Sequence, residues 1–299
     1  MAKKKTNTGK VSPDLYPFQS RYINICGYKL HYLEEGNGDP VLMLHGNPSW
    51  SFYYRNLVQS LSPFYHCLVP DHIGMGYSDK PGDDAYNYTL SRRVKDLEEF
   101  LDAKDINQNI TLILHDWGGI IGMSYACRHP EAIKKIVILN TAAFHLPEGK
   151  HFPFFLRFTR TLPGEFLVRA FNSFSVGATR IGVQRTRMTK EVRRAYTAPY
   201  NSWKNRIAIL RFIQDIPLKK EDPAFDLVMD VQNNLHLFHN TPVLIAWGMK
   251  DQVFDKDFLN KWMEYLPQAW VYRFDDCGHY ILEDAREEVG QLIVDFLAK

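Results

Sequence analysis

The sequence is poor in cysteine and lacks any long hydrophobic run. Its four cysteines, Cys26, Cys67, Cys127 and Cys277, do not show the Cys-x-x-Cys spacing of zinc sites and thioredoxin-like motifs. No run approaches the roughly 18 apolar residues that a membrane-spanning helix needs. The basic run Lys3–Lys5 precedes no apolar stretch and so does not resemble a secretory signal. We therefore expect a cytoplasmic protein with reduced thiols, without a membrane span and without a metal.

An excess of charge of either sign is also absent. The chain has 36 lysines and arginines against 34 aspartates and glutamates, a net charge of +2 over 299 residues. This balance does not supply the basic surface of a nucleic-acid-binding protein, so no nucleic-acid partner is expected. Hydrophobic residues make up 45% of the chain and charged residues 23%, which is typical of a globular protein with its own core.

Short apolar runs alternate with helical patterns along most of the chain. The first two runs flank Gly27 as in a hairpin, and most of the others are continuous apolar stretches, typical of parallel strands covered on both faces. The alternation predicts an α/β fold with a mostly parallel eight-stranded sheet. The expected strands are Tyr22–Ile25, Lys29–Leu33, Val41–Leu44, His66–Val69, Ile110–Leu114, Lys135–Asn140, Pro242–Trp247 and Val271–Phe274. The expected core helices are Arg55–Leu61, Leu90–Leu101, Gly119–Arg128, Asp257–Tyr265 and Arg286–Leu297.

The alternation stops over residues 144–235. This segment shows no strand pattern, has helical stretches at Lys190–Tyr196 and Trp203–Ile213, and is too long for a loop. We predict a helical cap inserted between the sixth and seventh strands. Residues 21–143 and 236–299 then form the core, and residues 1–20 a disordered tail. The cap phenylalanines are expected to pack in the cap's own interior more than in a pocket wall: Phe152, Phe154, Phe155 and Phe158.

Ligands bind at the carboxyl ends of the strands in open α/β sheets, so the residues just beyond each strand carry the chemistry. The fifth strand is followed by the run HDWGG, residues 115–119, and then by an apolar helix. A strand, a polar residue, two glycines and a helix are the layout of a nucleophile elbow, which raises one side chain at a helix N-terminus. Here that side chain is Asp116. Taken alone, Asp116 could instead be a helix cap.

Two further residues complete a triad with Asp116. Asp251 follows the seventh strand and His279 follows the eighth. The order nucleophile, acid, histidine resembles that of the α/β hydrolases. Asp275 and Asp276 also adjoin His279 but fit a turn better, so we predict that Asp251 orients His279.

An aspartate nucleophile indicates a substrate with an electrophilic sp3 carbon. Serine attacking such a carbon would leave an ether, whereas aspartate leaves an ester, which can be opened. His279 would then act on the second step as a base toward water or as a proton carrier. The Trp117 indole and the Asn47 side-chain amide are both hydrogen-bond donors. If they converge over the elbow, they would stabilise a departing halide or carboxylate.

These motifs resemble a known family, the haloalkane dehalogenases and their relatives among the α/β hydrolases. The resemblance covers nearly all of the chain beyond the first twenty residues and is carried by HGNPSW (45–50), HDWGG (115–119), GMKD (248–251) and GH (278–279). Asn140, in place of a glutamate, resembles the third subfamily. Further runs resemble the β-lactone decarboxylases of bacterial long-chain olefin biosynthesis: VPDHIG (69–74), LNTAAF (139–144), APYNSW (198–203) and RFIQDIP (211–217).

The resemblance implies an α/β-hydrolase fold and the decarboxylation of cis-3,4-dialkyl β-lactones (oxetan-2-ones) to cis-alkenes and carbon dioxide. It implies Asp116, Asp251 and His279 as catalytic residues, and Asn47 and Trp117 as substrate- and anion-binding residues. It implies no cofactor, and it implies as partners a hydrophobic small-molecule substrate and the β-lactone synthetase and reductase of the same pathway.

Three alternatives remain open on the sequence. The first is a haloalkane dehalogenase, which would use the same five residues to release alcohol and halide. The second is an epoxide hydrolase, for which Tyr196 and Tyr200 would be the acids. The third is a catalytically silent binding module with a hydrolase fold. For the decarboxylase itself, attack at the ring carbon and attack at the lactone carbonyl are equally compatible with the sequence.

Overall fold

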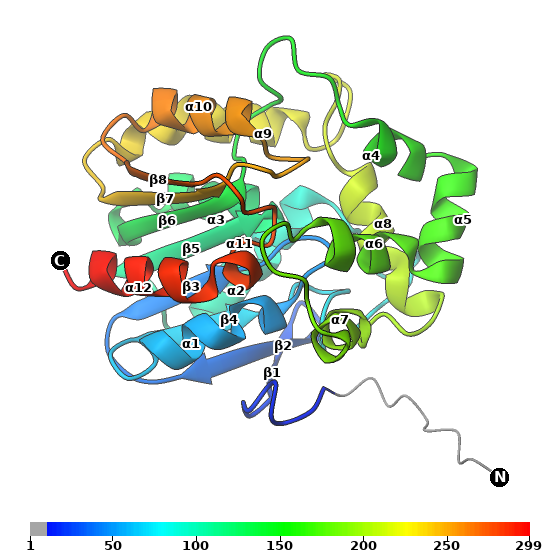
Figure 1. The fold of residues 1–299 in the computed structure, drawn as a ribbon, viewed down its shortest axis with the longest axis horizontal. Helices are drawn as coiled ribbons and strands as arrows, with labels where there is room; N and C mark the ends of the chain where they lie inside the picture. Colours follow the sequence, from blue (N-terminus) through cyan, green and yellow to red (C-terminus); the bar gives the residue numbers. More distant parts are fainter. Residues whose placement is uncertain (1–10) are drawn as a thin grey trace.

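The structure is a computed structural model that describes residues 11–299. Its strands form one sheet in the order β1-β2-β4-β3-β5-β6-β7-β8 (Figure 1). β2 pairs antiparallel with β1 and β4, and every other neighbouring pair is parallel. The predicted α/β fold and its mostly parallel sheet are thus confirmed. The strands are β1 (Arg21–Ile25), β2 (Tyr28–Glu35), β3 (Pro40–Leu44), β4 (His66–Pro70), β5 (Ile110–Asp116), β6 (Ile133–Thr141), β7 (Val243–Gly248) and β8 (Trp270–Phe274).

Helices cover the sheet. α1 packs on α12, while α2 and α9 both pack on α3. β5 lies in the middle of the sheet and is buried along its whole length, which is why its sequence is a continuous apolar run. The core helices are α1 (Arg55–Leu61), α2 (Leu90–Ala103), α3 (Trp117–Arg128), α9 (Phe225–Asn234), α10 (Lys256–Tyr265), α11 (Ile281–Asp284) and α12 (Arg286–Leu297).

After β6 the chain forms helices that stand to one side of the sheet, in the segment where the sequence analysis places a helical cap (Figure 1). We use the name cap for α4 (Phe154–Thr159), α5 (Leu162–Phe171), α6 (Ser173–Ile181), α7 (Lys190–Thr197) and α8 (Ile207–Gln214). The sequence predicted α7 and α8 but not the others. α9, which the sequence analysis counts with the cap, packs on the core helix α3.

The sequence analysis predicts a disordered tail over residues 1–20, but residues 11–20 contact the core. Tyr16 is buried and its hydroxyl is hydrogen-bonded to the Ser51 hydroxyl at 2.6 Å, and the Val11 N–H donates to the Tyr77 hydroxyl at 2.9 Å. These are tertiary contacts that local sequence patterns do not encode. The rest of the predicted tail, including Lys3–Lys5, lies outside the described residues. Within residues 11–299, no helix has the length and apolar character needed to cross a bilayer.

Candidate active site

Asp116 stands at a sharp turn between β5 and α3. Its φ of 51° and ψ of −125° lie in a region that is strained for any residue but glycine. The turn is possible because the two glycines that follow let the helix approach its neighbours closely. A Cβ on Gly118 would overlap the Leu44 carbonyl oxygen, and one on Gly119 would overlap the Thr141 hydroxyl. The predicted elbow is therefore present, with Asp116 at its tip.

The Asp116 carboxyl group is almost entirely removed from water, with the residue 8% exposed. Its Oδ1 accepts a hydrogen bond from the backbone N–H of Asn47 at 2.5 Å. Burial raises the pKa of Asp116, whereas the nearby His279 ring and the backbone N–H groups of Asn47 and Trp117 act to lower it. Two backbone N–H groups directed at one carboxylate form the kind of pocket that stabilises an oxyanion.

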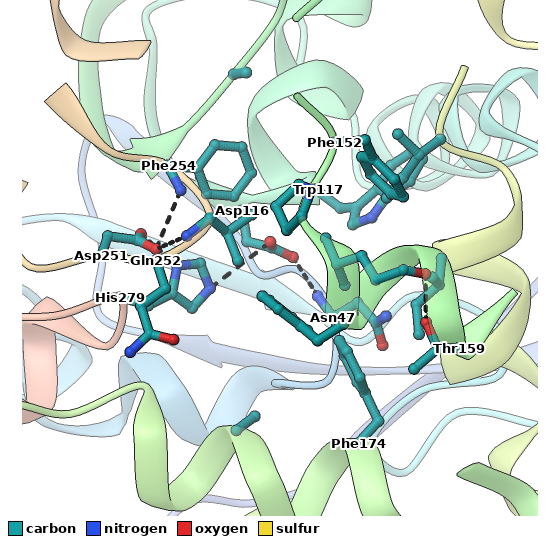
Figure 2. A pocket seen from close by; sticks show the side chains of 18 of the residues that line it. Asn47, Asp116, Trp117, Phe152, Thr159, Phe174, Asp251, Gln252, Phe254 and His279 are labelled. Atoms are coloured by element: carbon teal, nitrogen blue, oxygen red, sulfur yellow. Dashed lines mark hydrogen bonds and ion pairs between the residues drawn. The ribbon is translucent and has the colours of Figure 1, made fainter. Parts of the chain in front are cut away.

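His279 and Asp251 form the rest of the triad. Nδ1 of His279 lies 2.8 Å from Oδ2 of Asp251, and Nε2 lies 3.7 Å from Oδ2 of Asp116 (Figure 2). Burial acts to lower the pKa of His279, but the Asp251 carboxylate raises it above its usual value. The hydrogen bond to Asp251 orients the ring so that Nε2 faces the nucleophile. The structure thus brings together the three predicted catalytic residues.

Asp251 is itself held by several donors. Its Oδ1 accepts from the backbone N–H groups of Val253 at 2.7 Å and Phe254 at 3.1 Å. Its Oδ2 also accepts from Nδ2 of Asn140 at 3.0 Å, and Asn140 is in turn fixed by both backbone groups of Gly248. The sequence analysis used Asn140 only as a mark of the third subfamily and did not predict this contact. Its position at the end of β6, next to β7, was the available signal for this contact.

The two predicted anion-binding residues, Asn47 and Trp117, both line the cavity over Asp116. The side chain of Asn47 already makes a hydrogen bond, however. Its Nδ2 donates to the Ile209 carbonyl of α8 at 3.0 Å, and its Oδ1 has no hydrogen-bond partner among residues 11–299. The Trp117 ring packs against Phe212 of the same cap helix, with ring centroids 5.2 Å apart. The backbone of Asn47 thus contacts the nucleophile, while its side chain joins the core to the cap.

Two other candidate residues, Asp276 and His115, do not belong to the triad. Asp276 is on the surface, where both its carboxylate oxygens pair with Arg185 at 2.8 Å. His115 points away from Asp116, with its Nε2 2.9 Å from the His279 carbonyl oxygen. These positions agree with the choice of Asp251 as the residue that orients His279.

The cap tyrosines that an epoxide hydrolase would require are engaged in other contacts. The Tyr196 hydroxyl donates to Glu283 at 2.6 Å, and the Tyr200 hydroxyl donates to the Ser49 carbonyl at 3.2 Å. The cavity wall formed by the described residues includes neither tyrosine. The geometry therefore does not favour epoxide chemistry.

A cavity of about 450 Å³ lies between core and cap, with Asp116, Asp251 and His279 in its wall. This volume is in the range of sites for small organic ligands. Phe152, Phe155 and Phe158 line it, although Phe152 and Phe155 also pack with Leu156 and Ile213 in the cap. The expectation that these side chains fill the cap interior therefore holds for Phe152 and Phe155 but not for Phe154 and Phe158, which are exposed.

The wall of the cavity is mostly apolar. Besides the triad and Asn47, its polar lining residues are His145, Lys150, Thr159, Ser173 and Gln252. Such a site suits a largely apolar substrate that carries a reactive polar group.

Comparisons with known proteins agree with this geometry. The family model of the alpha/beta hydrolase fold matches residues 39–285. The chain is 56% identical to a cis-3-alkyl-4-alkyloxetan-2-one decarboxylase of Shewanella oneidensis, over 95% of this chain and 90% of that protein. It is 48% identical to one of Xanthomonas campestris, over 95% and 97%. Among solved structures it is similar to the haloalkane dehalogenase DatA of Agrobacterium tumefaciens, with a TM-score of 0.84 and 24% identity over 94% of this chain and 96% of that one.

Replacing the triad acid tests its assignment against a neighbouring carboxylate. Asp251→Asn keeps the size of the side chain but removes the charge that orients His279, so we expect turnover to fall by about 10³-fold or more. The matched control is Asp276→Asn, which alters only a surface ion pair and should leave kcat within about twofold. Steady-state kinetics of both variants test which carboxylate orients His279. A large loss of turnover in Asp276→Asn, together with near-normal turnover in Asp251→Asn, would contradict the assignment of Asp251.

Gly46 tests how closely the site is packed. A Cβ at this position would overlap the Asp116 carboxyl group, so Gly46→Ala should displace the nucleophile and lower kcat/KM by about 10²-fold or more. The control is Gly290→Ala in α12, where a Cβ would meet no atom of residues 11–299 within 4 Å. That change should raise stability by up to about 1 kcal/mol through helix propensity and spare activity. Full activity in Gly46→Ala would show that the site is looser than described.

Proposed function

The chain belongs to the α/β-hydrolase fold family and, within it, to the family of the cis-3-alkyl-4-alkyloxetan-2-one decarboxylases, and we propose that it converts cis-3,4-dialkyl β-lactones to cis-alkenes and carbon dioxide. The observation that carries this proposal is the 56% identity to such a decarboxylase along 95% of the chain, cap included. The buried aspartate at the elbow, below an apolar cavity, supports the same chemistry.

In the first proposed step, Asp116 attacks the ring carbon that bears the ring oxygen. Oδ1 is held by the backbone N–H of Asn47, so Oδ2, which faces His279, is the oxygen placed to react. A bond forms between Oδ2 and this carbon while the carbon–oxygen bond of the ring breaks. The products of this step are an ester on Asp116 and a free carboxylate on the adjacent carbon. We assign the stabilisation of that carboxylate to the Trp117 indole N–H and to the second side-chain N–H of Asn47, since the first donates to the Ile209 carbonyl.

In the second proposed step, the intermediate fragments. The bond to the carboxylate breaks and releases carbon dioxide, its electron pair forms the alkene, and the bond to Oδ2 breaks to restore the Asp116 carboxylate. Neither water nor an oxidant takes part. Attack with inversion followed by an anti fragmentation keeps the cis geometry of the ring in the alkene. The His279 ring lies beside Asp116, with Nε2 3.7 Å from Oδ2, where it is placed to stabilise the carboxylate as it leaves.

The physiological setting follows from the same chemistry. We propose that the enzyme acts in the cytoplasm at the end of long-chain olefin biosynthesis, beside the synthetase that closes the β-lactone and the reductase that precedes it. All four cysteines are free thiols, as is usual in a reducing compartment. The apolar cavity supports a substrate with two alkyl chains.

Product analysis tests the function. Purified protein is given a cis-3,4-dialkyl β-lactone and, in parallel, a 1-bromoalkane of similar length, and alkene, carbon dioxide and bromide are measured. We expect cis-alkene and carbon dioxide from the lactone at a rate well above bromide release, and neither product from Asp116→Ala. Rapid bromide release without alkene from any cis-lactone would instead assign the chain to the activity of its more distant relatives, such as the haloalkane dehalogenase of Psychrobacter cryohalolentis, 30% identical over 95% of this chain and 94% of that protein.

A further inference from the structure

The outer side of the cap exposes large apolar side chains. Phe154 is 81% exposed, Leu162 84%, Phe166 53% and Phe171 65%. They lie on α4 and α5, at the edge of the molecule away from the sheet (Figure 1). Contiguous apolar surface of this kind marks a site of interaction in soluble proteins.

Contacts between the rings join part of this surface. The ring of Phe166 lies 5.9 Å from that of Phe171 and 6.1 Å from that of Trp203, which is 45% exposed. Phe154 and Phe158 lie on α4, which packs on α5, the helix that carries Leu162 and Phe166. We name these exposed side chains together the apolar cap face: Phe154, Phe158, Leu162, Phe166, Phe171 and Trp203.

The cap is also strongly cationic, although the whole chain is nearly neutral. Residues 150–224 contain 15 lysines and arginines against five aspartates and glutamates, while the rest of the chain has 21 against 29. Two of the cations, Arg157 and Lys204, are exposed and lie next to members of the apolar cap face in the sequence. Arg157 lies between Phe154 and Phe158 in α4, and Lys204 directly follows Trp203. An apolar face bordered by exposed cations is typical of proteins that bind anionic membrane surfaces.

The apolar cap face continues into the active-site cavity. Phe158 and Leu167 are 40% and 38% exposed, and both also line the cavity over Asp116. Ile181, 50% exposed at the end of α6, does the same. The surface that would face a membrane is thus the one beside the cavity. This juxtaposition matters because a lactone with two alkyl chains partitions from water into lipid.

We propose that the apolar cap face binds the surface of an anionic phospholipid bilayer and sets the cavity against the lipid from which the substrate enters. The membrane binding stands on the exposed surface alone, whereas its purpose rests on the proposed function. A bilayer is a better occupant than a protein because the face joins insertable aromatic side chains, bordering cations and the cavity wall. The phenylalanines and Leu162 would enter the acyl region, and Arg157 and Lys204 would meet the phosphates.

Binding to vesicles tests the proposal without any substrate. The full-length protein is mixed with vesicles of phosphatidylcholine alone or of equal parts phosphatidylcholine and phosphatidylglycerol, and bound protein is measured by sedimentation. We expect at least about tenfold tighter binding to the anionic vesicles, weakened by added salt. The double variant Leu162→Ser/Phe166→Ser should bind at least about tenfold more weakly than wild type, because two apolar contacts are lost. Arg157→Gln/Lys204→Gln should lose about fivefold for each charge.

The matched control is Phe64→Ser, which removes a side chain that is 68% exposed on the core and should leave vesicle binding unchanged. Circular dichroism and turnover of a short-chain, water-soluble lactone show that each variant is folded, since none of the changed residues lines the cavity formed by the described residues. Failure to bind anionic vesicles, or equal binding by Leu162→Ser/Phe166→Ser and wild type, overturns the proposal and leaves a protein partner for the face. Vesicle binding by a protein inactive on every lactone would uphold the proposal and refute the proposed function instead.

Discussion

The site depends on keeping a charged carboxylate at a buried, strained turn. A backbone conformation like that of Asp116 costs about 1–3 kcal/mol, and an unpaired buried charge costs several more. The surrounding structure offsets both costs. The turn directly follows β5, a buried strand near the centre of the sheet. The backbone N–H of Trp117 at the start of α3 and that of Asn47 in the loop after β3 both favour the charged carboxylate. The carboxyl group that results is poorly solvated and fixed in orientation, as the proposed role of Asp116 as nucleophile requires.

The remaining polar groups extend this arrangement across the sheet. Asp116, Asn140, Asp251 and His279 stand at or just beyond the ends of β5, β6, β7 and β8, four consecutive neighbours in the sheet. Asp251 accepts hydrogen bonds from both Asn140 and His279, and His279 in turn faces Asp116. Because parallel strands bring their carboxyl ends to one edge, residues far apart in the chain meet there without special loops. The cap lies over them and supplies much of the apolar wall of the cavity.

Features of the site that follow from strand patterns could be predicted from the sequence, whereas those set by tertiary packing could not. Asp116, Asp251 and His279 follow clear strand patterns, so the sheet edge alone brings them together. The side-chain direction of Asn47 and the contact between Asn140 and Asp251 depend on tertiary packing and could not be predicted. α4 and α5 were missed because their exposed Phe154, Leu162 and Phe166 break the alternation of polar and apolar faces expected of surface helices. The exposure of these apolar side chains is explained if the proposed bilayer covers them.

In the proposed mechanism, Asp116 forms a covalent bond to a substrate carbon and is released by fragmentation rather than by hydrolysis. Intact-protein and peptide mass spectrometry of His279→Ala with each substrate tests it most directly. A bromoalkane should leave a stable mass increase equal to the alkyl group on the peptide carrying Asp116, because the base that activates water is gone. A cis-β-lactone should still release alkene, more slowly and without an adduct that accumulates. An adduct that persists with the lactone would contradict direct fragmentation and favour attack at the carbonyl, and the absence of any adduct on Asp116 with the bromoalkane would contradict its role as nucleophile.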